Sequence, residues 1–344
     1  MGPSALWAEM GFIITMAGIS LSVTGRLTIQ IQEYSMAEII KAVKTSGISD
    51  AGKMTEVMAA FLEYTAKHLP DDVLNKLKEL RTKETEPLAL EIYDLMFRNI
   101  EMADKLSRPV CQDTGYMQFW IRCGAEFPLI GELEEILTAA LLEATSVAPL
   151  RFNVVETFDE NNTGTNTGTG APTFWWDIIP SWDGCEIYTY PAGGGCSLPG
   201  HAMVLMPGQG YEEAVRFVMD RMTSYGLNAC PPLFVGVGFG ASAETAAMNA
   251  KRALMRPVGS HNQNELAAGM EQLLEDGINA IGFGPQGMGG KYSVLGVNIE
   301  NTARHPATLG VAVTTGCWCH RRGCIEFDRE LNFTAKTHSG FAFR

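Results

Sequence analysis

Residues 228–237 read Asn-Ala-Cys-Pro-Pro-Leu-Phe-Val-Gly-Val, and this stretch with its neighbours decides the fold class. Its last five residues form a short apolar run of the kind that is typical of a buried strand. Apolar residues recur at helical spacing on both sides of it, at 211–225 and 243–254, and again at 264–276. Two further apolar runs, 294–299 and 309–314, predict additional strands. The C-terminal half is therefore expected to mix strands with helices.

The N-terminal half predicts helices first and strands afterwards. Helical spacing connects Met54, Val57, Met58, Phe61 and Leu62. Further helical patterns cover 88–102 and 132–148, and β-rich runs cover 117–121, 174–179, 186–190 and 202–206. We predict an α+β (mixed) fold in which an N-terminal helical region is followed by a mixed sheet packed with helices.

The same patterns predict the domain organisation. Because the chain has no internal repeat or long linker, we expect residues 36–323 to form one domain with a helical part at 36–107. Residues 1–35 are expected to be a disordered leader or start extension, and 324–344 a C-terminal tail. The uncharged stretch 10–25 is shorter than the ~20 residues of a spanning helix and has no basic residue before it. We therefore expect a cytoplasmic protein whose cysteines stay reduced.

Composition excludes several classes of protein. Of the 344 residues, 46% are hydrophobic and 19% are charged, which excludes a disordered chain. Eight cysteines are too few for a secreted disulfide scaffold of this length. The net charge of −13 argues against nucleic-acid and anionic-membrane partners. The segment 291–322 is an exception, because it holds one acidic residue and four basic residues, namely Lys291, Arg304, Arg321 and Arg322. This local positive charge predicts a binding site for a small anion.

Four loops rich in glycine, asparagine and threonine interrupt the periodic segments, at 109–115, 161–170, 192–196 and 282–290. Any one of them is compatible with an ordinary turn. Together, each beside a cysteine, carboxylate or amide, they indicate backbone that approaches a ligand. The chain has no GxGxxG or GxxxxGK[ST] motif, so nucleotide binding is not expected.

Three cysteines stand at the ends of predicted elements, where side chains from distant segments can converge. Cys111 begins a Cys-Gln-Asp-Thr-Gly loop, Cys230 precedes two prolines, and Cys317 follows the strand at 309–314. Three thiolates suit an iron–sulfur cluster with one open iron, which can act as a Lewis acid. A zinc knuckle at 317–320 is disfavoured because no second ligand pair lies at the right distance. Three other cysteines are predicted to pack as small apolar residues: Cys123, Cys185 and Cys324.

Five motifs in unbroken order identify a resemblance to a known family. They are Cys-Gln-Asp-Thr-Gly at 111–115, Asn-Thr-Gly-Thr-Asn at 162–166, Gly-Gly-Gly at 193–195, Asn-Ala-Cys-Pro-Pro at 228–232 and Gly-Cys-Trp at 316–318. From about Glu56 to Gly323 the chain resembles the α-type iron–sulfur hydro-lyases. These are the α subunits of L(+)-tartrate dehydratases and the similar N-terminal domain of class I fumarases.

The resemblance implies a cofactor and roles for individual residues. A [4Fe–4S] cluster would be held by Cys111, Cys230 and Cys317. Asp113 would be the acid beside the departing hydroxyl, and His305 would hydrogen-bond at the active site. Substrate would be bound by three further residues: Gln112, Arg151 and Gly195.

The resemblance also implies an activity and a partner. We expect the α subunit of a dehydratase that converts L(+)-tartrate to oxaloacetate, with fumarate/malate hydration or a non-catalytic iron–sulfur subunit as alternatives. The base would come from a β subunit, in an α2β2 assembly. The loop at 193–200 is similar to the tartrate branch, whereas Met-Gly-Gly-Lys-Tyr at 288–292 is similar to the fumarase branch. Cys319 stands where relatives carry a small residue and would be an extra thiol near the cluster.

Overall fold

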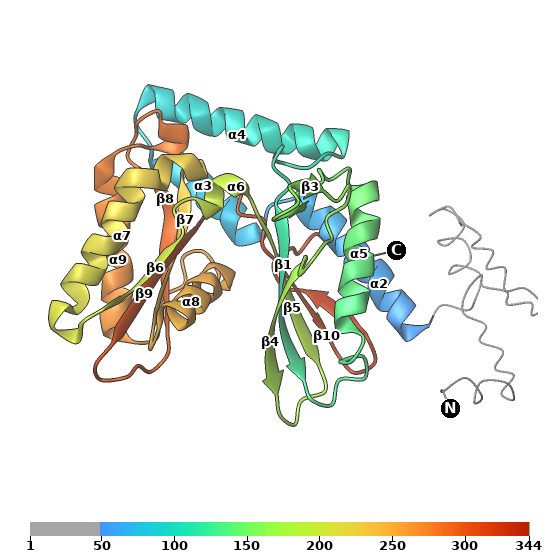
Figure 1. Ribbon diagram of the computed structural model, residues 1–344. Helices are drawn as coiled ribbons and strands as arrows, with labels where there is room; N and C mark the ends of the chain where they lie inside the picture. Colours follow the sequence, from blue (N-terminus) through green and yellow to red (C-terminus); the bar gives the residue numbers. More distant parts are fainter. Residues whose placement is uncertain (1–48, 344) are drawn as a thin grey trace, which may run out of the picture. The chain divides into compact units, whose positions relative to one another are not determined.

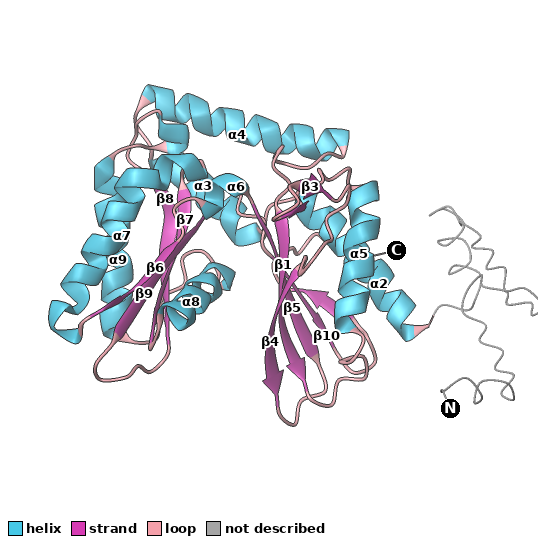
Figure 2. Cartoon of the chain, in the orientation of Figure 1, coloured by secondary structure: helices cyan, strands magenta, loops and turns pink. Residues whose placement is uncertain are grey.

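The computed structural model describes residues 49–343, which are built around two β-sheets (Figure 1). The leader predicted at 1–35 lies outside the described residues. From residue 49 onward, helices precede strands, and strands then mix with helices, so the predicted α+β fold is confirmed. Figure 2 shows this distribution of helix and strand. No helix among the described residues combines the length and the apolar character that crossing a bilayer requires.

The first sheet has five strands in the order β11-β10-β5-β1-β4. β1 pairs parallel with β4 and antiparallel with β5, so strands from distant parts of the chain meet in it. The side chains of α2 and α5 pack on it, and Phe61, Phe119 and Leu137 are completely buried there. The elements of this half are α2 (Asp50–Lys67), β1 (Tyr116–Gly124), α5 (Leu133–Val147), β4 (Thr173–Ile179), β5 (Cys185–Ala192), β10 (Gly323–Phe327) and β11 (Phe333–Ala335).

The second sheet has four strands in the order β6-β9-β7-β8, with helices on both faces (Figure 1). α8 packs against β7 where Gly236 and Gly238 leave room for it. A Cβ at Gly238 would come within 2.0 Å of the Ala246 carbonyl oxygen, so only glycine allows this close approach. The elements are β6 (His201–Leu205), α7 (Gly210–Tyr225), β7 (Leu233–Gly240), α8 (Ala243–Met255), α9 (Glu265–Ile281), β8 (Val294–Asn301) and β9 (Leu309–Gly316).

Helices α3 (Asp71–Lys83) and α4 (Pro87–Leu106) complete the N-terminal helical region. Their apolar residues share a third core with residues from both sheets, including Tyr190 of β5 and Phe234 of β7. Cys111 and Cys317 pack against this core. The remaining short elements are β2 (Val155–Glu156), β3 (Asn161–Asn162), α6 (Gly194–Ser197) and the 3₁₀ turns η1 (Pro207–Gln209), η2 (Gly226–Ala229) and η3 (Pro285–Gly287).

The segment 324–344 was predicted to be a C-terminal tail, and its described residues, 324–343, contribute to the fold. β10 pairs with β5, and β11 pairs with β10. Beyond β11, the Asp71 amide at the start of α3 donates to the Thr337 carbonyl (2.9 Å), and His338 is buried against Phe61 and Tyr64. The short strands of this segment escaped detection because they are specified by pairing with a strand far away in sequence.

Candidate active site

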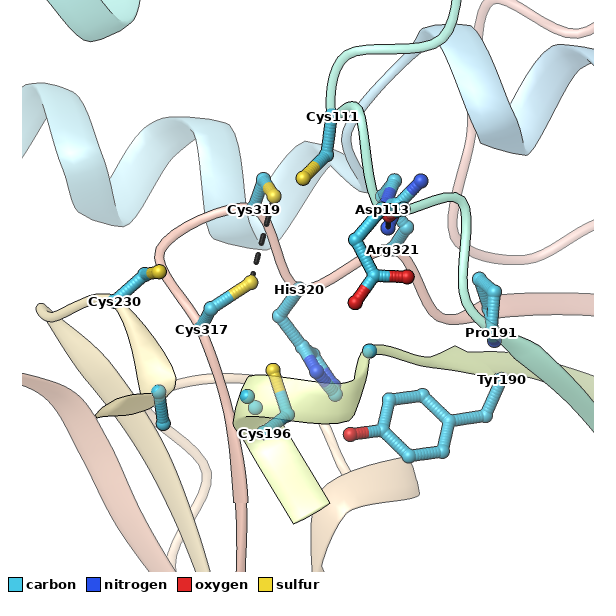
Figure 3. Close-up of a pocket in the computed structure, with 14 residues that line it drawn as sticks. Cys111, Asp113, Tyr190, Pro191, Cys196, Cys230, Cys317, Cys319, His320 and Arg321 are labelled. Atoms are coloured by element: carbon cyan, nitrogen blue, oxygen red, sulfur yellow. Dashed lines mark hydrogen bonds between the residues drawn. The ribbon is translucent and has the colours of Figure 1, made fainter. Parts of the chain in front are cut away.

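Five cysteines line one cavity of about 60 Å³ where loops from both halves of the structure meet (Figure 3). They are Cys111, Cys196, Cys230, Cys317 and Cys319. The cavity therefore brings together the three cysteines that were predicted as ligands, Cys319, which was predicted to lie near them, and Cys196, which was not predicted. Asp113, Gly195 and Arg321 also line it.

Cys230 and Cys317 are positioned by the same end of the second sheet. β7 begins at Leu233 and β9 ends at Gly316, and the two strands are antiparallel neighbours in which Phe234 pairs with Gly316. Cys230 adopts a left-handed conformation (φ +55°) after η2, and its side chain is exposed. The Trp318 amide donates to the Cys230 carbonyl at 3.1 Å, so a backbone hydrogen bond joins the two loops.

Cys111 reaches the cavity from the loop that links α4 to β1. The preceding residue, Val110, is held on both sides. Its amide donates to the Ala66 carbonyl at 3.0 Å, and its carbonyl accepts from Asn99 Nδ2 at 2.7 Å. The loop that carries Cys111 is thus fixed to α2 and α4, whereas the positions of Cys230 and Cys317 are set by the strands of the second sheet.

Cys196 and Cys319 place additional sulfur atoms beside the proposed ligands. The Cys317 and Cys319 Sγ atoms are 3.4 Å apart (Figure 3). Hydrogen bonds from the Cys196 and Cys319 thiols, together with the charge of Arg321, hold the pKa of Cys317 well below its ordinary value. A hydrogen bond from Cys319 and the charge of Arg321 lower the pKa of Cys111 to about 7. Burial and the nearby thiolates raise the pKa of Cys230. Two of the three proposed ligands therefore favour the thiolate form, which is the form that binds metal.

Asp113 is held by backbone amides at the cavity. Its Oδ1 accepts from the Gly115 amide at 3.0 Å, and its Oδ2 accepts from the Gly194 amide of the triple-glycine loop at 2.8 Å. A Cβ on Gly193 would lie 2.9 Å from Oδ2, and a Cβ on Gly195 would lie 2.4 Å from the Asn228 carbonyl oxygen. Glycines in this loop thus allow Asp113 and the Cys230 loop to come close to one another.

Gln112 and Arg151 have exposed side chains and do not line the cavity, although both lie beside the loop that does. The Arg151 amide donates to Thr114 Oγ1 at 3.0 Å, which ties the segment to the Asp113 loop. Their predicted substrate contacts remain predictions.

His305 lies at the opposite end of the second sheet from the cysteines. Strand β9 separates it from Cys317, and an eight-residue strand spans about 26 Å. His305 is exposed, its Nδ1 accepts from the Ala307 amide at 3.1 Å, and its neighbour Arg304 lines a second cavity of about 190 Å³. Within one chain, the structure does not bring His305 together with the proposed ligands.

The basic residues of 291–322 do not form one patch. Arg322 is buried and paired with Asp72 (Nη2 to Oδ2, 2.8 Å), and Arg304 donates to backbone carbonyls near the second cavity. Arg321 is the member of this group that lines the cysteine cavity. Cys319, which the sequence predicted as an extra thiol near the cluster, lines the cavity, whereas sequence reasoning missed Cys196 as a cavity residue.

The donor set suits a polynuclear cluster. Within residues 49–343, no three Cys, His, Asp or Glu side chains are grouped tightly enough to hold a single metal ion. An iron–sulfur cube separates its cysteine ligands more widely than one ion does, and it requires sulfur ligands. Thiols from three different loops line one cavity, so the chemistry of the donors fits such a cluster.

The chain is similar to known proteins along most of its length. The family model described as fumarate hydratase (Fumerase) matches residues 55–326. The chain is 51% identical over 287 residues to the α subunit of L(+)-tartrate dehydratase of Escherichia coli, covering 83% of this chain and 95% of that protein. It is 32% identical over 284 residues to a putative L(+)-tartrate dehydratase α subunit of Methanocaldococcus jannaschii, covering 81% of this chain and all of that protein.

Proposed function

Because the chain belongs to the fumarate hydratase (Fumerase) family, and is therefore a hydro-lyase, we propose that it is the α subunit of an iron–sulfur enzyme that dehydrates L(+)-tartrate to oxaloacetate. The observation that carries this proposal is the convergence of Cys111, Cys230 and Cys317 on one cavity beside Asp113. The names of the relatives favour tartrate as the substrate.

Cys111, Cys230 and Cys317 would hold the [4Fe–4S] cluster. When bound, a cluster with three protein ligands supplies an open iron that polarises a hydroxyl oxygen as a Lewis acid. The lowered pKa values of Cys111 and Cys317 prepare these thiols as ligands. A non-catalytic electron carrier is a weaker alternative, because electron carriers generally use four ligands.

Asp113 would deliver the proton that the departing hydroxide needs. Proton transfer requires a group that is held within hydrogen-bond reach of the leaving oxygen. Amides from Gly115 and Gly194 fix both carboxyl oxygens of Asp113 at the cavity, so its position does not depend on substrate. Gly195, Gln112 and Arg151 would bind the substrate, with Arg151 at a carboxylate.

The base is proposed to come from a β subunit, since the relatives are named as α subunits. The exposed side chain of Cys230 leaves one side of the cavity open to such a partner. Strand β9 separates His305 from the cysteine cavity of its own chain. In the proposed α2β2 assembly, His305 would therefore have to contribute to the cysteine cavity of the other α subunit.

The test is an anaerobic assay of the chain with its partner subunit after reconstitution with iron and sulfide. We expect oxaloacetate formation from L(+)-tartrate to equal or exceed malate–fumarate interconversion. A faster fumarate reaction would instead support the fumarate hydratase that the family match suggests. No reaction with either dicarboxylate would contradict the proposal and favour a non-catalytic subunit.

A further inference from the structure

Arg321 is a buried cation whose hydrogen bonds are incomplete. Only 3% of the residue is exposed, and its Nη2 donates to the Asp113 carbonyl at 2.6 Å. Its Nε and Nη1 are buried and have no hydrogen-bond partner among the residues that the structure describes. No carboxylate of residues 49–343 forms an ion pair with it. Buried guanidinium groups are costly unless they are paired, so these free N–H groups need an explanation.

The next residue shows that the fold can satisfy a buried arginine. Arg322 is 1% exposed, pairs with both carboxyl oxygens of Asp72, and donates from Nε to the Met255 carbonyl. Two adjacent arginines of equal burial therefore differ in one respect. Arg322 forms an ion pair with a carboxylate, whereas Arg321 forms none with any carboxylate of residues 49–343.

The surroundings of Arg321 indicate what completes its hydrogen bonds. It lines the cysteine cavity, where its positive charge interacts with Cys111, Cys317 and Cys319 (Figure 3). A [4Fe–4S] cluster on three thiolates carries net negative charge, and its sulfur atoms accept hydrogen bonds. The ligand that fits an unpaired guanidinium at this place is an anionic sulfur-rich group.

We propose that Arg321 is a positioning residue that donates a hydrogen bond from one of its unpartnered N–H groups to the cluster while its Nη2 holds the Asp113 loop. This inference rests on the proposed function. One side chain would thereby stabilise the reduced, more negative state of the cluster and keep the acid in a fixed position beside it.

The experiment compares Arg321→Gln and Arg321→Lys with the unsubstituted full-length chain after anaerobic reconstitution. Iron and sulfide per chain, the rate of iron loss to a chelator, and the reduction potential from a titration followed by electron paramagnetic resonance are measured. Loss of a residue that hydrogen-bonds to metal ligands typically weakens metal binding by about 10–100-fold. We expect Arg321→Gln to lose iron faster by a factor in this range and to have a more negative potential. Arg321→Lys should lie in between because it keeps the charge.

The matched control is Lys251→Met, which also removes a partly buried positive charge. Lys251 Nζ lies over the Tyr190 ring, 4.9 Å from its centre, and Lys251 is not among the residues that line the cavity. We expect this variant to retain iron like the unsubstituted chain. Equal iron loss and equal potential in Arg321→Gln and Lys251→Met would overturn the proposal.

Two further outcomes can be distinguished from equal behaviour of Arg321→Gln and Lys251→Met. If Arg321→Gln fails to fold, as judged by circular dichroism, the comparison passes to Arg321→Lys, and a lysine variant indistinguishable from the unsubstituted chain overturns the proposal. If the unsubstituted chain itself takes up no iron, the proposed function fails and this inference fails with it.

Discussion

Cys230 differs from Cys111 and Cys317 in having an exposed side chain, so its role can be tested without disturbing the core. Its backbone is already fixed, because its carbonyl accepts from the Trp318 amide and its own amide donates to Leu227. Its thiol, unlike those of Cys111 and Cys317, is not among the groups that pack against the third core. Its removal should affect ligand binding far more than folding.

We therefore predict that Cys230→Ser leaves the free energy of unfolding within about 0.5 kcal/mol of the unsubstituted chain, as is usual for exposed positions. Iron uptake on reconstitution should nevertheless be lost. The control is Cys324→Ala, at a buried cysteine of β10 outside the cavity, which should lower stability by about 1 kcal/mol and retain iron. Full iron uptake by Cys230→Ser would show that this thiol is not a ligand.

At the scale of elements, the triple-glycine loop and η2 pack so closely that a methyl group cannot be added at their contact. A Cβ on Gly195 would meet the Asn228 carbonyl at 2.4 Å, whereas the atom nearest to a Cβ on Gly194 is Asp113 Oδ2 at 3.9 Å. Two neighbouring glycines in one loop thus provide a matched pair for a steric test.

Gly195→Ala should displace η2 and the adjoining Cys230 loop, lowering the free energy of unfolding by about 1–3 kcal/mol and reducing iron uptake. Gly194→Ala should have little effect on either measurement, because the added methyl meets no backbone atom. Thermal unfolding and iron content are measured for both. Equal behaviour of the two variants would contradict the close contact at Gly195.

The elements also show what the sequence can and cannot predict. Long apolar runs such as β7, β8 and β9 were predictable because both faces of these strands are buried. β10 was not, because its five residues are specified by β5, which lies far away in the chain. Cys111, Cys230 and Cys317 were identifiable from their places at element ends. Cys196 offers no such signal, since only tertiary packing of α6 against β9 brings it to the cavity.

At the scale of the whole molecule, His338 connects the C-terminal segment to the N-terminal helices. It is 2% exposed, and its ring Nε2 lies 3.3 Å from the His68 carbonyl. Burial lowers its pKa from 6.5 to about 4. The unfolded chain therefore binds this proton before the folded chain does as the pH falls.

The pKa of His338 is lower in the folded chain than in the unfolded chain. Its neutral form therefore contributes its full share of the unfolding free energy above pH 6.5, and this contribution is lost as the pH falls through about 4. We predict that about 3 kcal/mol of unfolding free energy disappears over this window because of His338. His338→Gln should remove this pH dependence, as measured by urea unfolding at several pH values. Replacement of the exposed His201 by Gln is the control. Parallel pH profiles for His338→Gln and the unsubstituted chain would contradict the assignment.

The return of β10 to the first sheet also constrains the order of events during synthesis. β10 can pair with β5 only after the ribosome has synthesised residues 193–322 and β10 itself. The hydrogen bond between α3 and Thr337 forms later still. Because contacts between distant segments form slowly, a nascent chain on the ribosome holds an unfinished sheet with an unpaired edge for most of its translation. Early termination anywhere before β10 would leave that edge open to other chains, so truncated products are expected to aggregate rather than to fold partially.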